Sequence, residues 1–89
     1  MKTSNIILYT TAWCPYCHLA KRLLKSKGVE FEEIDVDGNP ELRAEVARRA
    51  GQTTVPQAFI DGVARGGYDD LVALERQGEL DGILGLSAD

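Results

Sequence analysis

Cys14 and Cys17, the two cysteines of the chain, frame the stretch CPYCH. The C-x-x-C spacing is typical of a redox dithiol, and a histidine directly after it also fits the attachment pattern of a c-type haem. Haem attachment needs export and a second axial ligand, yet Met1 is the only methionine and the first residues do not resemble a signal peptide. A zinc site needs more ligands, and His18 is the only histidine. We therefore interpret the pair as a redox dithiol rather than as a metal site or two structural cysteines.

A strand and a helix are expected on either side of this dithiol. Residues 6–9 form an apolar run with β-branched members, as in a strand buried on both faces. Residues 15–27 have their apolar positions on one helical face, and Gly28 supplies the stop. Pro15 suits the first helical position, so Cys14 is expected at the N-cap.

The N-cap position of Cys14 predicts different roles for the two sulfurs. The unpaired backbone N–H groups and the helix dipole favour a thiolate at Cys14, whose pKa we expect well below the free value of ~8.5. Cys17 lies about one turn further along the same face, where we expect it to be more buried and protonated. Cys14 would attack a disulfide, and Cys17 would resolve the mixed disulfide that results.

The remaining elements follow from periodicity and turn signals. Residues 29–36 predict a second strand, whose alternation slips at Glu32-Glu33 and indicates a bulge or an early end. Asp61-Gly62 between two apolar runs predicts a hairpin. The other expected elements are a helix from Asn39-Pro40 to Gly51 that buries Leu42, Val46 and Ala50, strands at 57–60 and 63–65, a helix opened by Asp69-Asp70 and closed before Gly78, and a helical turn at 80–84.

The order β-α-β-α-β-β-α places the chain in the α/β class. Its first half is a βαβ unit, so the first two strands should be parallel with a right-handed crossover. The hairpin adds antiparallel strands, which gives a four-stranded mixed sheet with helices on both faces. A chain of 89 residues fits one domain over residues 1–89.

Composition narrows the possible partners. With 44% hydrophobic and 27% charged residues the chain reads as soluble and globular, and its net charge of −4 argues against a nucleic-acid partner. No run of apolar residues is long enough to cross a membrane. Because the first residues do not resemble a secretory signal, we expect a cytoplasmic protein, and in a reducing compartment a lone cysteine pair is more often catalytic or metal-binding than structural.

With the dithiol placed, the sequence resembles the glutaredoxin family over essentially its whole length. Three motifs carry the resemblance: CPYC at Cys14–Cys17, Thr54-Val55-Pro56 before the hairpin, and Gly66-Gly67-Tyr68-Asp69-Asp70 at the last helix. The resemblance implies the thioredoxin fold and glutathione-dependent reduction of protein–glutathione mixed disulfides and protein disulfides. Glutathione would be a co-substrate, with no permanently bound cofactor and no metal. Glutathionylated or disulfide-containing proteins would be the partners of a monomer.

The resemblance also assigns a glutathione site. In the family the proline that matches Pro56 is cis and faces the dithiol, and the backbone at Val55 pairs with the cysteine part of glutathione like an added strand. The equivalents of Tyr68 and Asp69 hold its γ-glutamyl end at a helix N-terminus. The full set implied is Tyr16, Arg43, Thr54, Val55, Pro56, Gly67, Tyr68 and Asp69.

Two positions depart from the common family pattern. Thr11 stands where many glutaredoxins carry a lysine that meets the glycine carboxylate of glutathione. Arg43 matches a position that also contacts this carboxylate and would compensate, unless it belongs to a solvated basic face with Arg48 and Arg49. Trp13 before the nucleophile is more usual in thioredoxins, and would pack over the site or extend the surface that meets a protein disulfide.

Two rival functions stay open on the sequence alone. Trp13 favours a thioredoxin-like reductase fed by a flavoprotein, whereas the Pro15-Tyr16 interior and the third motif oppose it. Some glutaredoxins instead carry an iron–sulfur cluster between two copies, with the nucleophilic cysteine and glutathione as ligands. In the family a proline after that cysteine disfavours the cluster.

Overall fold

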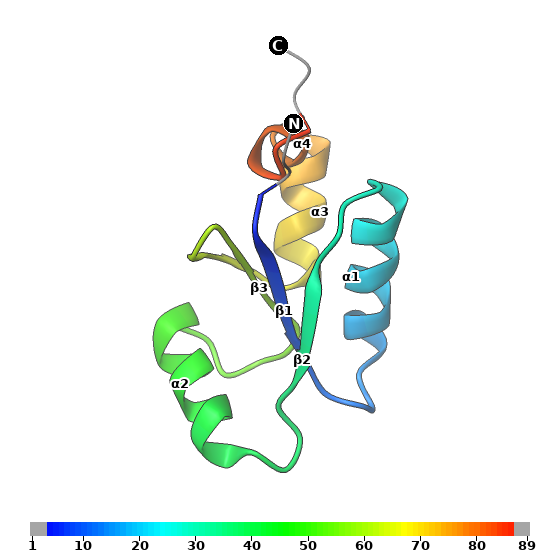
Figure 1. The fold of residues 1–89 in the computed structure, drawn as a ribbon. Coiled ribbons are helices and arrows are strands. Elements are labelled where there is room, and N and C mark those ends of the chain that lie inside the picture. The colour runs from blue at the N-terminus through cyan, green and yellow to red at the C-terminus, as the bar shows by residue number, and fades with distance from the viewer. Residues whose placement is uncertain (1–3, 87–89) are drawn as a thin grey trace.

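The computed structural model describes residues 4–86 and shows one mixed sheet with helices on both faces (Figure 1). The predicted element order is confirmed, including the short final helix. The elements are β1 (Ile6–Thr10), α1 (Pro15–Ser26), β2 (Glu32–Asp35), α2 (Pro40–Ala50), β3 (Gln57–Ile60), β4 (Val63–Gly66), α3 (Tyr68–Arg76) and α4 (Leu80–Ile83).

The strands lie in the order β2-β1-β3-β4. β1 pairs with β2 in parallel, and the β1–β3 and β3–β4 pairs are antiparallel, as the sequence predicts. The predicted hairpin between β3 and β4 is confirmed, and Asp61 and Gly62 both have positive φ, 52° and 80°, which is the geometry of a two-residue type I′ turn.

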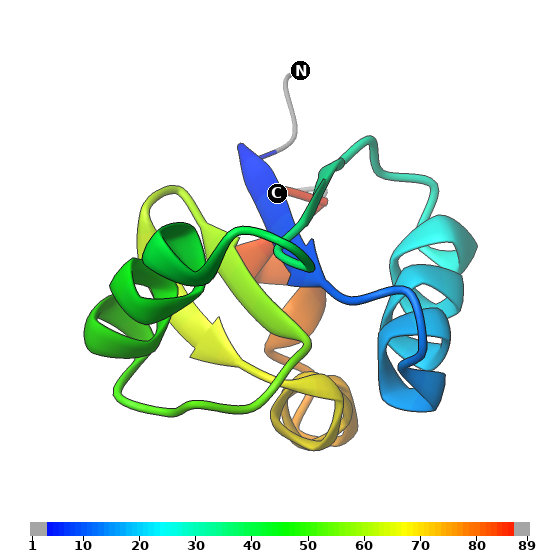
Figure 2. The same ribbon diagram turned by 90° about the horizontal axis from the view of Figure 1, so that it is seen from below.

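Two apolar clusters fill the two sides of the sheet. Figure 2 shows α2 on one side and α1 and α3 on the other. The larger cluster lies on the side of α1, α3 and α4 and includes Leu8, Leu24 and Leu71. The smaller one lies under α2 and includes Val46 and Phe59. Leu42 and Ala50, predicted to be buried on α2, are only partly buried, and Val46 is the α2 residue of this cluster that is fully buried.

The second strand is shorter than predicted and begins late. Residues 29–36 were expected, whereas β2 spans only Glu32–Asp35, and its pairing with β1 starts at Glu32. Val29 and Phe31 pack into the larger cluster, while Ile34 and Val36 pack into the smaller one. The phase slip at Glu32-Glu33 therefore marks a change of side, and the strand begins at the slip. The register irregularity lies elsewhere in the sheet, between Ala58 and Phe59.

Specific residues mark the start of α3 and the end of α1. α3 begins at Tyr68, one residue before the predicted start, with Gly67 as its N-cap. Lys27 caps α1, and its Nζ lies 2.6 Å from Glu75 Oε2 and 2.8 Å from Asp81 Oδ1. These ion pairs join the end of α1 to α3 and α4. No helix within residues 4–86 is long and apolar enough to cross a membrane.

Candidate functional site

The dithiol lies at the N-terminus of α1, where the sequence places it. Cys14 is the N-cap, its Sγ accepts a hydrogen bond from the backbone N–H of Cys17 at 3.0 Å, and Pro15 occupies the first turn. The two sulfurs are joined in a disulfide, with the Cα atoms 5.1 Å apart. Cys14 is 7% exposed and Cys17 1%, so the prediction that Cys17 is the more buried is confirmed. The low pKa expected for the Cys14 thiol stays a prediction.

The loop before β3 meets the dithiol through its backbone. The Val55–Pro56 peptide bond is cis, as the resemblance implies. Cys14 Sγ lies 3.7 Å from the carbonyl oxygen of Val55. Pro56 is buried, whereas Thr54 is exposed to solvent.

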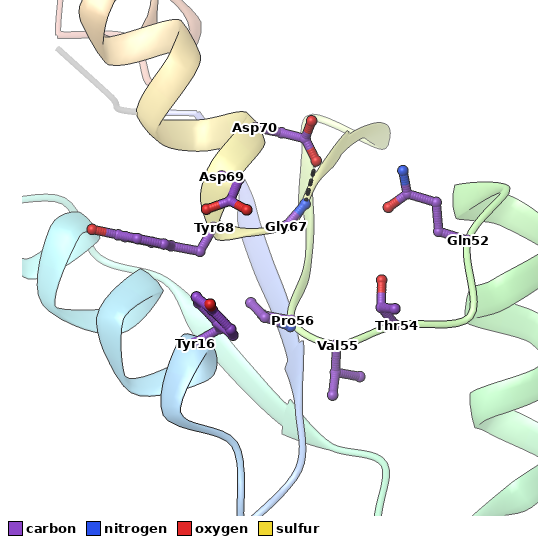
Figure 3. Close-up of a pocket in the computed structure, with 9 residues that line it drawn as sticks. All are labelled: Tyr16, Gln52, Thr54, Val55, Pro56, Gly67, Tyr68, Asp69 and Asp70. Carbon is purple, nitrogen blue, oxygen red and sulfur yellow. Dashed lines mark hydrogen bonds between the residues drawn. The ribbon is translucent and has the colours of Figure 1, made fainter.

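A pocket of about 260 Å³ opens between this loop, the start of α1 and the start of α3. Figure 3 shows residues from all three segments around it. The aromatic rings of Tyr16 and Tyr68 have centroids 6.3 Å apart and form one side. Its lining residues are Tyr16, Gln52, Thr54, Val55, Pro56, Gly67, Tyr68, Asp69 and Asp70. The structure thus brings together seven of the eight residues expected to bind glutathione.

The wall at α3 depends on two glycines. The backbone N–H of Gly67 donates to Asp70 Oδ2 at 2.9 Å, so a carboxylate satisfies one unpaired donor of the helix N-terminus (Figure 3). Gly66 has φ +86°, and a Cβ there would overlap the Asp70 carboxylate. A Cβ on Gly67 would lie 3.1 Å from the carbonyl oxygen of Pro56. Glycine at position 67 lets the α3 wall approach the loop, and glycine at position 66 leaves room for the Asp70 carboxylate.

Arg43 is the expected site residue that does not line the pocket. It is exposed on the outer part of α2, and no ion pair is found for it within residues 4–86. Trp13 is 96% exposed, so it does not pack over the dithiol and instead extends the surface beside it. His18 is exposed.

Three further contacts surround the segment that leads into the dithiol. The Thr10 hydroxyl donates to Glu33 Oε2 at 2.8 Å, and Lys21 Nζ lies 3.1 Å from the same oxygen. Partial burial alone would raise the pKa of Glu33, but the Thr10 hydroxyl and the Lys21 ammonium together hold it below its ordinary value. Asp37 Oδ2 accepts from the backbone N–H of Ala12 at 2.8 Å and fixes the turn before Trp13.

Three residues at this site, Asp70, Gln52 and Gln57, are not in the predicted glutathione-binding set. Asp70 occupies the third helical position, where an acidic side chain commonly returns to the N-cap backbone, so a capping pattern was available as a signal. Gln52 lines the pocket directly after the αL cap of α2, and nothing in its type or spacing marks it. Gln57 lies behind the loop and is buried.

Comparison with known proteins agrees with this geometry. Residues 6–64 match the family model named Glutaredoxin. A glutaredoxin of Pseudomonas aeruginosa is 63% identical over 79 residues, which are 89% of this chain and 94% of that one. The chain belongs to the glutaredoxin family. Glutaredoxin 3 of Escherichia coli is 54% identical over 81 residues, covering 91% of this chain and 98% of its own.

Solved glutaredoxin structures confirm the thioredoxin fold. The solution structure of a Brucella melitensis glutaredoxin superposes with a TM-score of 0.85 at 51% identity, covering 97% of this chain and 94% of the other. A buckwheat glutaredoxin–glutathione complex gives 0.87 at 28% identity, covering 92% and 77%. Glutaredoxins are glutathione-dependent thiol–disulfide oxidoreductases, so the predicted reaction class is confirmed at the level of the family.

Proposed function

We propose that the chain reduces protein–glutathione mixed disulfides and protein disulfides, with Cys14 as the nucleophile and Cys17 as the resolving thiol. The observation that carries this assignment is the position of Cys14. It caps α1, is the more exposed of the two sulfurs, and touches the Val55 carbonyl beside the pocket. The reduced Cys14 sulfur would receive the Cys17 backbone N–H and the positive end of the helix dipole, both of which favour thiolate.

Reduction of a glutathionylated protein needs Cys14 alone. The Cys14 thiolate attacks the glutathione sulfur of the mixed disulfide, the bond between glutathione and the protein breaks, and the protein thiolate leaves and takes a proton from solvent. Cys14 is then itself glutathionylated. A second glutathione thiolate attacks the bound glutathione sulfur, which forms glutathione disulfide and returns Cys14 as thiolate.

Reduction of a protein disulfide uses both cysteines. Attack by Cys14 opens the disulfide and leaves a mixed disulfide with the protein. The Cys17 thiol loses its proton and attacks Cys14 Sγ, which releases the second protein thiolate and forms the disulfide seen in the structure. Two glutathiones then reduce this disulfide. Family potentials of about −200 to −230 mV lie close to that of the glutathione pool, so exchange runs with little free-energy change.

The pocket supports the glutathione site implied by the resemblance. The backbone groups of Val55 would pair with the cysteine part of glutathione, and the N-terminus of α3 would receive the γ-glutamyl carboxylate. The exposed carboxylate of Asp69 would take the ammonium group, while Tyr16 and Tyr68 cover the side of the pocket. Thr54, Pro56 and Gly67 complete the walls. Arg43 lies outside them, so any contact with the glycine carboxylate would occur beyond this pocket.

The wider assignment follows the same reasoning. Glutathione serves as a co-substrate, and the chemistry above needs no bound cofactor or metal. The chain would act as a single-domain monomer in the cytoplasm, on glutathionylated and disulfide-containing proteins.

The test is glutathione-dependent reduction of a glutathionylated peptide by wild type, Cys14→Ser and Cys17→Ser. We expect Cys14→Ser to be inactive and Cys17→Ser to keep activity, because only the Cys14 thiolate attacks the glutathione sulfur of the mixed disulfide. A protein disulfide as substrate should require both cysteines. Reduction of the wild type by thioredoxin reductase, together with no activity with glutathione, would contradict the proposal.

A further inference from the structure

Gln57 has a polar side chain that is buried beside an apolar cluster. It begins β3, pairs with Tyr9 across the sheet and is 1% exposed. Phe59, two residues further along the strand, packs in the cluster under α2. Because side chains alternate along a strand, Gln57 projects to this same side of the sheet, where the loop after α2 returns to β3.

The amide nitrogen of Gln57 reaches this loop. Its Nε2 donates to Gln52 Oε1 at 3.0 Å and to the carbonyl oxygen of Thr54 at 2.9 Å, with Thr54 Oγ1 at 3.4 Å. A side-chain amide carries two hydrogens, which satisfy the two shorter contacts. Both acceptor residues line the candidate pocket.

Besides the amide, the Val55 side chain holds this loop by packing against the cluster under α2. Within residues 4–86 no backbone–backbone hydrogen bond involves residues 52–55, and residues 52–54 are exposed. The contact of the Val55 carbonyl with Cys14 joins the far end of the loop to the dithiol. The buried amide therefore fixes the backbone immediately before the groups assigned to glutathione.

We propose that Gln57 is a positioning residue that orders residues 52–55 before glutathione binds. This inference rests on the proposed function, in which that loop forms one wall of the glutathione site. Without the amide, the loop would have to be ordered during binding, and the entropy lost at that moment weakens affinity. The attack by Cys14 is affected much less, because the hydrogen bonds of Gln57 go to the loop and not to the sulfurs.

The experiment compares wild type, Gln57→Met and Gln77→Met. Methionine keeps the length of the side chain but donates no hydrogen bond. Gln77 is the matched control, because it is exposed at the end of α3 and does not line this pocket. The probe is S-methylglutathione, which cannot form a disulfide. We expect Gln57→Met to raise its Kd about tenfold and Gln77→Met to change it by less than about twofold.

Three readouts separate positioning from a general structural effect. The rate of Cys14 alkylation in the reduced protein should stay within about twofold of wild type. In turnover of a glutathionylated peptide, KM should rise while kcat holds. The Gln57→Met effect should also shrink in a Gln52→Ala background, since contacting residues are not additive.

Two outcomes overturn the inference. An unchanged Kd shows that the loop is ordered without Gln57, and a parallel fall in alkylation rate shows that the substitution acts on Cys14. A third outcome separates the two proposals. If wild type does not bind S-methylglutathione, the proposed function fails. If the backbone amide hydrogens of residues 52–55 nevertheless exchange faster in Gln57→Met than in wild type, Gln57 still orders the loop. If Gln57→Met does not fold, Gln57→Asn retracts the amide by one methylene, and the same expectations apply.

Discussion

Replacing Gly66 by alanine should damage both stability and glutathione binding. Gly66 has φ +86°, a conformation that costs a residue with a Cβ about 1–2 kcal/mol. The added Cβ would also lie 2.8 Å from Asp70 Cβ and overlap its carboxylate. The carboxylate must then leave the backbone N–H of Gly67, which costs about 1–2 kcal/mol as the loss of a cap, and the short Cβ–Cβ contact adds to this.

Gly62 provides the matched comparison, because it has φ +80° and nothing lies within 4 Å of the position of its Cβ. Gly62→Ala should therefore carry the backbone cost alone. We expect the free energy of unfolding in urea to fall by about 2 kcal/mol more for Gly66→Ala than for Gly62→Ala, which corresponds to about 8–16 °C in Tm for a domain of this size. The KM for glutathionylated peptide should rise in Gly66→Ala only. Equal destabilisation by the two substitutions would refute the role assigned to the Asp70 contact.

Three further predictions concern charges and the exposed tryptophan. Glu33→Gln should flatten the acid limb of a curve of stability against pH, whereas Glu32→Gln should not. The pKa of Glu33 is lowered in the folded protein, so its contribution to stability is complete above pH 4.5 and is lost as the pH falls through the folded-state pKa. Identical curves for the two variants would contradict this. Lys27→Met should lower Tm, and the loss should shrink in high salt. Hydrogen bonds from Lys27 to Asp81 and, to a smaller extent, to Glu75 raise the pKa of Lys27. The stability that these ion pairs contribute is therefore complete below pH 10.5 and is lost as the pH rises through the raised pKa. A Tm difference between the two proteins that persists at pH 12 would point to packing instead. Trp13→Ala should leave Tm unchanged, because the side chain is almost fully exposed. It should raise the KM for a protein disulfide more than the KM for a glutathionylated tripeptide. Equal changes in both KM values would show that Trp13 does not contact protein substrates.

The fold was predictable because local signals and topology agree. The type I′ turn at Asp61-Gly62 and the cap at Cys14 each follow from residue type and position. The start of β2 was not predictable in the same way. A slip in alternation is equally compatible with a bulge, an early end or a change of side, and only packing against two separate clusters shows that the third applies.

The lining of the candidate pocket was predictable where a motif marks it. The pocket gathers seven of the residues that the resemblance implies, whereas Arg43 lies outside it, because position on a helix does not tell how far a flexible side chain reaches. Gln52 and Gln57 carry no motif of their own. Their pairing depends on where the α2–β3 loop meets the sheet, which is a long-range property of the fold.

The acidic character of β2 has a consequence for how copies of the chain meet. β2 is an outer strand of the sheet, so one side of its backbone faces away from any partner strand. Three of its four residues are Glu32, Glu33 and Asp35, all exposed. A second molecule that tried to extend the sheet here would bring like charges about 5 Å apart across the new strand pair. The charges on this edge therefore oppose edge-to-edge pairing of the sheets of two molecules at neutral pH.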